Sequence, residues 1–210
     1  MAQNLTLLDH PLIRHKLTIL RDKATPPALF RQVMHEVGPL LLYEATRDLP
    51  LGETEIETPL ERGRFPTLDS ASVALISILR AGNGLVDGMM DLMPSVAVGH
   101  VGVYRDHETL EAVRYYFRVP EGLADRLVIV ADPMLATGNT ASMALSLLKR
   151  AGAKRLKFIA LVAAPEGVAA LSSAHPDVPI FAAALDRGLN DKGYIMPGLG
   201  DAGDRVYGTM

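Results

Sequence analysis

The sequence predicts an α/β fold: a doubly wound, mostly parallel sheet with helices on both faces. Five short apolar segments rich in β-branched residues are typical of strands buried on both faces. Strand alternates with helix five times, which favours a parallel sheet over a hairpin-built one. With 210 residues and a net charge of −3, the chain is long enough for one domain with a sizeable core.

Residues 1–50 are predicted to form an N-terminal helical arm. The first helix ends before the two prolines at 26–27, where the second begins. Gly-Pro at 38–39 is expected to interrupt the second helix, which then resumes over 40–46. An arm of this kind is expected to pack on the core or on a second subunit.

The core is predicted to span residues 70–186. Before it, a glutamate stands at every second position over 53–58, an alternation expected of an edge strand that is charged against aggregation. Residues 59–66 are assigned to a loop. The first buried strand is 73–79, and the apolar helix after it covers 85–93.

The strand 73–79 is followed by Arg80-Ala-Gly-Asn-Gly84. Gly82 and Gly84 would let a ligand approach the backbone closely, and Arg80 supplies positive charge, so the loop is a candidate pyrophosphate cradle. The alternative is an ordinary turn between a strand and a helix.

A third strand, 96–104, is predicted to end at Arg105. A charged stretch and a second extended segment, 112–119, follow it. Residues 105–122 are therefore assigned to a β-hairpin flap, since long loops between core strands often serve as lids.

The stretch 127–141 is the most informative one. Five apolar residues form a buried strand that ends in Asp132, and Pro133 is expected to stop the ladder. The small polar turn 136–140 then opens a helix, whose free N–H groups attract an anion. A carboxylate for a diol beside an anion site describes a ribose 5-phosphate site, and the alternative is a turn with a capping residue.

Two more strands, 156–164 and 178–185, enclose a short helix at 166–173. In parallel sheets, ligands bind at the carboxyl ends of the strands, near the switch in strand order. Four charged residues are predicted at such ends, which supports a site there: Arg80, Arg105, Asp132 and Asp186.

Residues 187–210 are rich in glycine and show no periodicity. A floppy tail is one interpretation. Its apolar content, including Tyr194, Ile195 and Leu199, is too high for a disordered tail, so we expect an ordered C-terminal segment.

Three motifs resemble one enzyme family. Asp132-Pro-Met-Leu-Ala-Thr-Gly-Asn-Thr140 resembles the phosphoribosyl diphosphate (PRPP) motif of type I phosphoribosyltransferases, in the form found in uracil phosphoribosyltransferases. Leu-Arg-Ala-Gly at 79–82 is similar to the family's pyrophosphate loop. Tyr-Ile-Met-Pro-Gly-Leu-Gly-Asp-Ala-Gly-Asp-Arg at 194–205 resembles its uracil-binding hood. Most of the superfamily has two adjacent acids where this chain has Asp132-Pro133.

The resemblance implies transfer of the phosphoribosyl group of PRPP to uracil, giving UMP and diphosphate. It implies Mg²⁺ held mainly through PRPP and water, with no dedicated metal site. The implied catalytic residues are Asp132, Arg105 and Asp201. The implied PRPP-binding residues are Arg80, Arg105, Asp132, Pro133, Met134, Leu135, Ala136, Thr137, Gly138, Asn139, Thr140 and Asp201. The implied uracil-binding residues are Ile195, Gly200, Asp201 and Ala202.

The family also implies a homodimer or higher oligomer, with GTP as an activator in some relatives. Composition points to a cytoplasmic protein without nucleic-acid or membrane partners: cysteine is absent, net charge is −3 and no apolar run approaches the ~20 residues of a membrane span. Two other classes stay open. A regulator of the same fold would bind pyrimidine nucleotide and RNA, and a flavodoxin-like or Rossmann-type module would need a Gly-x-Gly-x-x-Gly turn after its first strand.

Overall fold

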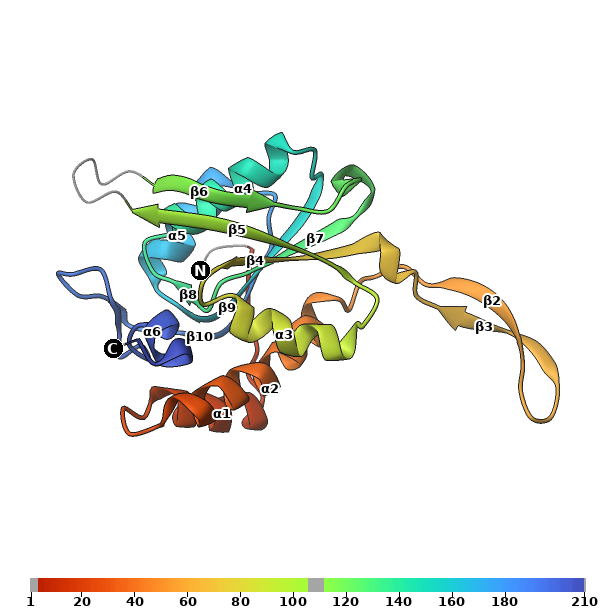
Figure 1. Cartoon of the computed structure of the whole chain (residues 1–210), viewed down its shortest axis with the longest axis horizontal. Helices are drawn as coiled ribbons and strands as arrows, with labels where there is room; N and C mark the ends of the chain where they lie inside the picture. The colour runs from red at the N-terminus through yellow and green to blue at the C-terminus, as the bar shows by residue number, and fades with distance from the viewer. Residues whose placement is uncertain (1–3, 106–111, 210) are drawn as a thin grey trace.

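The computed structural model describes residues 4–105 and 112–209. Its main sheet has eight strands in the order β1-β10-β9-β7-β4-β5-β6, with β8 paired to β9, and helices cover both faces (Figure 1). All neighbouring strands are parallel except β5 and β6, which confirms the predicted fold class. The strands are β1 Leu5–Leu7, β4 Val73–Leu79, β5 Ala97–Arg105, β6 Ala112–Arg118, β7 Leu127–Ala131, β8 Met134–Leu135, β9 Arg155–Ala163 and β10 Ile180–Leu185.

Each central strand presents alternate residues to two separate apolar cores. In β4, Val73 and Leu75 pack in the core with the N-terminal helices and α3, while Ala74 and Ile76 pack in the core with α4 and α5. This alternation follows from the two-residue period of a strand. The helices are α1 Pro11–Arg21, α2 Pro27–Ala45, α3 Asn83–Leu92, α4 Asn139–Arg150, α5 Pro165–Ala174 and α6 Ala202–Tyr207, with short 3₁₀ turns at Ser70–Ser72 and Leu123–Asp125.

The expected fivefold alternation of strand and helix is wrong in detail. Only α3, α4 and α5 connect parallel strands, and the chain passes from β5 to β7 through the antiparallel strand β6. The predicted hairpin around 105–122 is present as β5 and β6, and its residues 106–111 lie outside the described part of the chain.

The predicted break in the second helix is also wrong, because α2 continues through Pro39. Proline lacks the N–H that would bond to the carbonyl four residues earlier, that of His35. A Cβ at Gly88 of α3 would overlap this same carbonyl, and a Cβ at Gly38 would overlap the carbonyl of Leu85. The two glycines therefore let α2 and α3 cross at close range where the helix has lost a hydrogen bond.

The alternating segment 53–58 forms a strand, but not at the edge of the main sheet. It lies in β2 (Gly52–Glu57), which pairs antiparallel with β3 (Arg62–Thr67), a stretch assigned to a loop from sequence. The register places Glu57 opposite Arg62 and Glu55 opposite Arg64, so opposite charges stabilise the pairing. The hairpin projects from the body of the molecule (Figure 1).

The C-terminal segment is ordered rather than floppy. Two short strands, β11 (Gly188–Leu189) and β12 (Ile195–Met196), pair antiparallel and lead into α6. We call residues 187–209 the hood. Ile195, Leu199 and Val206 are buried in the core that contains the N-terminal helices, which is why this glycine-rich stretch folds.

Candidate functional site

The strand order reverses between β4 and β7. From β4 the chain moves to β5 on one side, and from β7 it moves to β9 on the other. The loops after β4 and β7 therefore diverge at neighbouring strand ends, which is where open α/β sheets bind ligands. The sequence motifs at 80–84 and 132–140 follow these two strands.

The segment after β7 is fixed to its neighbour β9. The Asp132 N–H donates to the Ile159 carbonyl at 3.1 Å, and the Pro133 carbonyl accepts from the N–H groups of Leu161 and Val162, both at 3.0 Å. Pro133 does end β7, but β8 resumes the parallel pairing with β9 immediately afterwards. The prediction that the ladder stops there is thus only half right. The pairing with β9 keeps its register on both sides of Asp132 and Pro133, so the acid is held between two paired segments.

The turn 136–140 packs against α5 and opens α4. Gly138 has φ +84° and caps the helix, in the left-handed region that favours glycine. A Cβ at Gly138 would lie 2.9 Å from the Gly167 carbonyl, and one at Gly167 would overlap the Ala136 carbonyl. Thr137 accepts a long hydrogen bond from the Asn139 N–H at 3.5 Å. The N–H groups of the first helical turn have no partner within the helix, so the turn is built as an anion site.

The loop after β4 is packed just as closely against β7. A Cβ at Gly82 would lie 2.6 Å from the Ala131 carbonyl and 2.7 Å from the Ser77 hydroxyl oxygen. The Ser77 hydroxyl donates to the Asn83 side-chain oxygen at 2.7 Å. These contacts place Arg80 at the edge of the switch point, and its side chain is 55% exposed.

Arg80 also contacts α6 of the hood. Its guanidinium donates to Asp204 at 3.1 Å and lies 5.7 Å from the centre of the Tyr207 ring. The Tyr207 hydroxyl donates to the Arg80 carbonyl at 3.1 Å. The loop after β4 and the C-terminal helix therefore form one side of the same site.

Two carboxylates face this site. Burial raises the pKa of Asp132 to about 7; the Met134 N–H, which donates to this carboxylate, opposes the rise, and repulsion from Asp201 adds to it. Asp201 is exposed and caps α6, accepting from the Asp204 N–H at 3.0 Å. Such a pair of acids favours a bound cation or hydroxyl donors over a second anion.

The remaining residues predicted for uracil lie beside Asp201. Ile195 and Ala202 are buried and Gly200 is exposed, with φ +79°. Arg105 is the last residue of β5, and its side chain lies outside the part of the chain that the structure describes. Within the described ranges, the other predicted positions converge on the carboxyl ends of β4 and β7 and on the start of α6.

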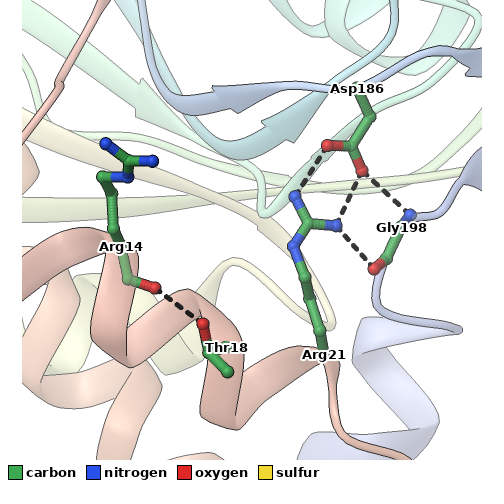
Figure 2. Close-up of polar contacts among 5 residues, drawn as sticks. All are labelled: Arg14, Thr18, Arg21, Asp186 and Gly198. Carbon is green, nitrogen blue, oxygen red and sulfur yellow. Dashed lines mark hydrogen bonds and ion pairs between the residues drawn. The ribbon is translucent and has the colours of Figure 1, made fainter.

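Asp186, at the end of β10, is engaged elsewhere. It forms an ion pair with Arg21 of α1 and accepts a hydrogen bond from the Gly198 N–H (Figure 2). Sequence reasoning assigned no role to Arg21, nor to the buried Arg205 that donates to three backbone carbonyls. The sequence offered one indication for Arg21, a charged residue next to the apolar stripe of its helix. Its pairing with Asp186 could not be predicted from the sequence spacing.

Two features are absent from the described residues: a cluster of metal ligands and a membrane-spanning helix. No group of three or more His, Cys, Asp or Glu side chains is close enough together there to hold a metal ion by itself. Within residues 4–105 and 112–209, no helix is long and apolar enough to cross a bilayer.

Comparison with known proteins agrees with this geometry. The family model described as uracil phosphoribosyltransferase matches residues 7–209. A uracil phosphoribosyltransferase of Mesorhizobium japonicum is 58% identical over 207 residues, covering 99% of each chain, and one of Agrobacterium fabrum is 59% identical over 204 residues, covering 97% of this chain and 98% of the relative.

Solved structures show the same fold. The AQ2163 protein of Aquifex aeolicus superimposes with a TM-score of 0.92 at 40% identity, covering 97% of both chains. An adenine phosphoribosyltransferase of Trypanosoma brucei shares the fold alone, with a TM-score of 0.58 at 13% identity over 90% of this chain and 86% of that one. The chain belongs to the uracil phosphoribosyltransferase family.

Proposed function

We propose that this protein transfers the 5-phosphoribosyl group of PRPP to uracil, forming UMP and diphosphate. The observation that carries the proposal is the convergence of a glycine-capped helix start, a half-buried carboxylate and a glycine-rich hood at one switch point. The relatives named above support the same reaction. Incubation of the protein with uracil, PRPP and Mg²⁺, with detection of UMP, tests it directly.

In this proposal, the turn Ala136–Thr140 binds the 5-phosphate through backbone N–H groups and the two threonine hydroxyls, with Pro133, Met134 and Leu135 shaping its approach. Asp132 accepts from the ribose hydroxyls and faces the positive charge that develops at the anomeric carbon. Arg80 and Arg105 bind the diphosphate, and charge-assisted hydrogen bonds from Arg80 stabilise the leaving group. Uracil lies against Ile195, Gly200 and Ala202.

The acids present fit a magnesium ion held mostly by the substrate. Asp132 and Asp201 interact electrostatically, and Mg²⁺ is commonly bound by one or two carboxylates together with substrate phosphates and water. When bound, the ion neutralises charge on the diphosphate. Asp201 contributes one carboxylate to this end of the site while its backbone stays fixed by the capped start of α6.

GTP activation and a cytoplasmic location also belong to the proposal, and both rest on the family resemblance. By the same resemblance, the flap over PRPP is assigned to the antiparallel strands β5 and β6, and residues 106–111 of the predicted flap lie outside the described part of the chain. Activity measured with and without GTP tests the first of these.

Replacing Arg80 with alanine is expected to lower kcat/KM for PRPP by about 10- to 150-fold, because a charge-assisted hydrogen bond contributes roughly 1.5–3 kcal/mol. Arg47→Ala is the matched control, since Arg47 follows the C-terminal end of α2 and pairs with Glu44. Steady-state kinetics with PRPP varied make the measurement. Unchanged PRPP kinetics in folded Arg80→Ala protein would show that Arg80 does not bind the diphosphate.

The raised pKa of Asp132 predicts a pH dependence. Below about pH 7 this carboxyl is protonated in the free enzyme and accepts hydrogen bonds from ribose less well. We expect kcat/KM for PRPP to fall by about tenfold per pH unit below that point, and Asp132→Asn to lack this limb. The measurement is the pH profile of both proteins, and an identical acid limb in the variant would assign it to another group.

Stability provides an independent control for this pKa. Between pH 3.8 and about 7 the folded protein holds a proton on Asp132 that the unfolded chain has lost. The contribution of Asp132 to the free energy of unfolding is therefore complete below pH 3.8, the pKa in the unfolded chain. It is lost as the pH rises through about 7, the pKa in the folded protein. Each unit of pKa shift corresponds to about 1.4 kcal/mol of stability. Because the Asp132 side chain is partly exposed and solvent screens its charge, we expect a loss of only about 2 kcal/mol, less than the whole pKa shift would give. Denaturant unfolding of Asp132→Asn should show no such loss.

Base choice is expected to depend on backbone groups. Between Met196 and Gly203, Asp201 is the one residue with an ionisable or amide side chain, so glycine-rich backbone must recognise uracil's acceptor–donor–acceptor edge. Cytosine presents an amino donor instead, and such a mismatch is rejected by about 10⁴ or more. We predict that Gly200→Val abolishes uracil use, and that Asp201→Ala impairs PRPP use without admitting cytosine. Cytosine turnover by Asp201→Ala would place discrimination in that side chain.

We also propose that the β2–β3 hairpin covers a second copy of the chain. Isolated two-stranded hairpins are marginally stable in water, yet this one exposes Leu60 (95%), Ile56 (46%) and Phe65 (37%). Light scattering coupled to size exclusion is expected to give a dimer for the parent and a monomer for Ile56→Lys combined with Leu60→Lys. Leu12→Lys, at an exposed position of α1, is the control. Dissociation by Leu12→Lys instead would locate the interface elsewhere.

A further inference from the structure

Arg21, Asp186 and Gly198 form a closed cluster of hydrogen bonds between three distant parts of the chain (Figure 2). The guanidinium of Arg21 donates to both carboxylate oxygens of Asp186, at 2.8 and 2.6 Å, and to the Gly198 carbonyl at 2.7 Å. The Gly198 N–H donates back to Asp186 at 2.9 Å. The last residue of α1 and the residue after β10 thus hold both peptide groups of one hood residue.

The burial and the geometry of the Arg21–Asp186 pair suit a role in positioning the backbone at Gly198. The Asp186 side chain is 6% exposed and that of Arg21 is 25% exposed, so this is not a solvent-exposed surface ion pair. A two-pronged arginine–carboxylate pair fixes orientation as well as distance. Gly198 has φ +61°, and a Cβ there would overlap the Ile195 carbonyl. Only glycine therefore fits at this position.

The next carbonyl along the hood is held in the same way. Arg205 donates to the Leu199 carbonyl at 2.7 Å and to the carbonyls of Leu20 and Asp22 at the end of α1. Its guanidinium lies 4.4 Å from the centre of the Phe30 ring. Two successive hood carbonyls are therefore bound by arginines: Arg21 in the last turn of α1, and Arg205 of α6, which also donates to carbonyls at that end of α1. The partial negative charge at the C-terminal end of a helix suits both cations.

These two carbonyls immediately precede Gly200, Asp201 and Ala202, three of the four residues assigned to uracil. With Gly198 and Leu199 fixed on the side of α1, the peptide groups from Gly200 to Ala202 have a defined orientation at the start of α6. Recognition by backbone depends on that orientation, because no side chain can adjust to the base. A misplacement of about 1 Å in such a site can cost about 100-fold.

We propose that Arg21 and Asp186 are positioning residues that set uracil selection by fixing the backbone of the hood at Gly198. The proposal rests on the proposed function, in which the hood binds uracil. Neither residue touches a substrate in this account, and both act through the Gly198 peptide groups. Apart from Asp201, the residues proposed for PRPP lie at or after the ends of β4, β5 and β7, and none of them belongs to the cluster.

The test is a set of variants measured with uracil, cytosine and PRPP. Arg21→Lys keeps the charge but has one nitrogen, which cannot bridge both carboxylate oxygens and the Gly198 carbonyl. We expect Arg21→Lys and Asp186→Asn to raise KM for uracil by about 10- to 100-fold and to reduce the preference for uracil over cytosine. KM for PRPP should rise by a factor at least about fivefold smaller, because Asp201 is the one hood residue assigned to PRPP. Arg14→Ala is the control, because Arg14 lies on the same helix and is largely exposed.

A second variant separates positioning from folding. Removing one partner of a buried ion pair leaves an unpaired charge, whereas replacing both by apolar residues is often neutral for stability. Arg21→Met combined with Asp186→Leu leaves no unpaired charge and only the Gly198 N–H and C=O without these partners. It should therefore lower the melting temperature less than Asp186→Leu alone and still show the raised KM for uracil. A folded double variant with the parent's KM for uracil would overturn the proposal.

Failure of the two proposals would look different. If the parent protein forms no UMP from uracil and PRPP, the proposed function is wrong. If the parent is active and the Arg21 and Asp186 variants lose uracil and PRPP affinity equally, the cluster is a general structural brace and the positioning role is wrong. A selective change in KM for uracil with unchanged Arg14→Ala kinetics supports the proposal.

Discussion

The buried guanidinium of Arg205 joins the two ends of the chain, and the rest of the site depends on this contact. It is 7% exposed and donates to backbone carbonyls at the end of α1 and in the hood. Burial lowers its pKa without neutralising it, so the charge must be met by oxygen acceptors. Arg31 of α2 adds a hydrogen bond to the Val206 carbonyl at 2.7 Å. The N-terminal helices thus carry the C-terminal segment, and a glycine-rich stretch becomes an ordered wall of the site.

The sheet supplies the other half of the site by topology. Reversal of strand order between β4 and β7 separates their loops and brings Arg80 and Asp132 to adjacent strand ends. Glycines at 82, 138 and 167 let these loops pack on backbone carbonyls, so the loops are positioned by the core rather than by their own contacts. Arg80 then reaches Asp204 and Tyr207 of α6. The parts of the site that we propose for diphosphate and for the base are therefore in contact, as a reaction that joins a base to the carbon losing diphosphate requires.

Sequence reasoning predicted the fold class and the motif positions because both are local. The apolar runs at 73–79 and 127–131 match β4 and β7 residue for residue, and the helix after the turn 136–140 begins at Asn139. Long-range contacts were beyond it. The continuity of α2 through Pro39 depends on α3, the pairing of β2 with β3 depends on cross-strand charges, and the partner of Asp186 lies 165 residues away. Membership of the uracil phosphoribosyltransferase family also removes the flavodoxin-like and Rossmann-type alternatives.

We infer that backbone groups of the hood recognise the base, and that Arg21 and Arg205 fix these groups by hydrogen bonds to the Gly198 and Leu199 carbonyls. A crystal structure of the protein with uracil and a non-hydrolysable PRPP analogue tests it most directly. The account predicts that main-chain groups of Ile195, Gly200 and Ala202 lie within hydrogen-bond distance of the uracil edge, with the Arg21–Asp186–Gly198 cluster unchanged. A side chain bonded to that edge in their place, or a hood that releases Gly198 from Arg21 when uracil binds, would contradict it.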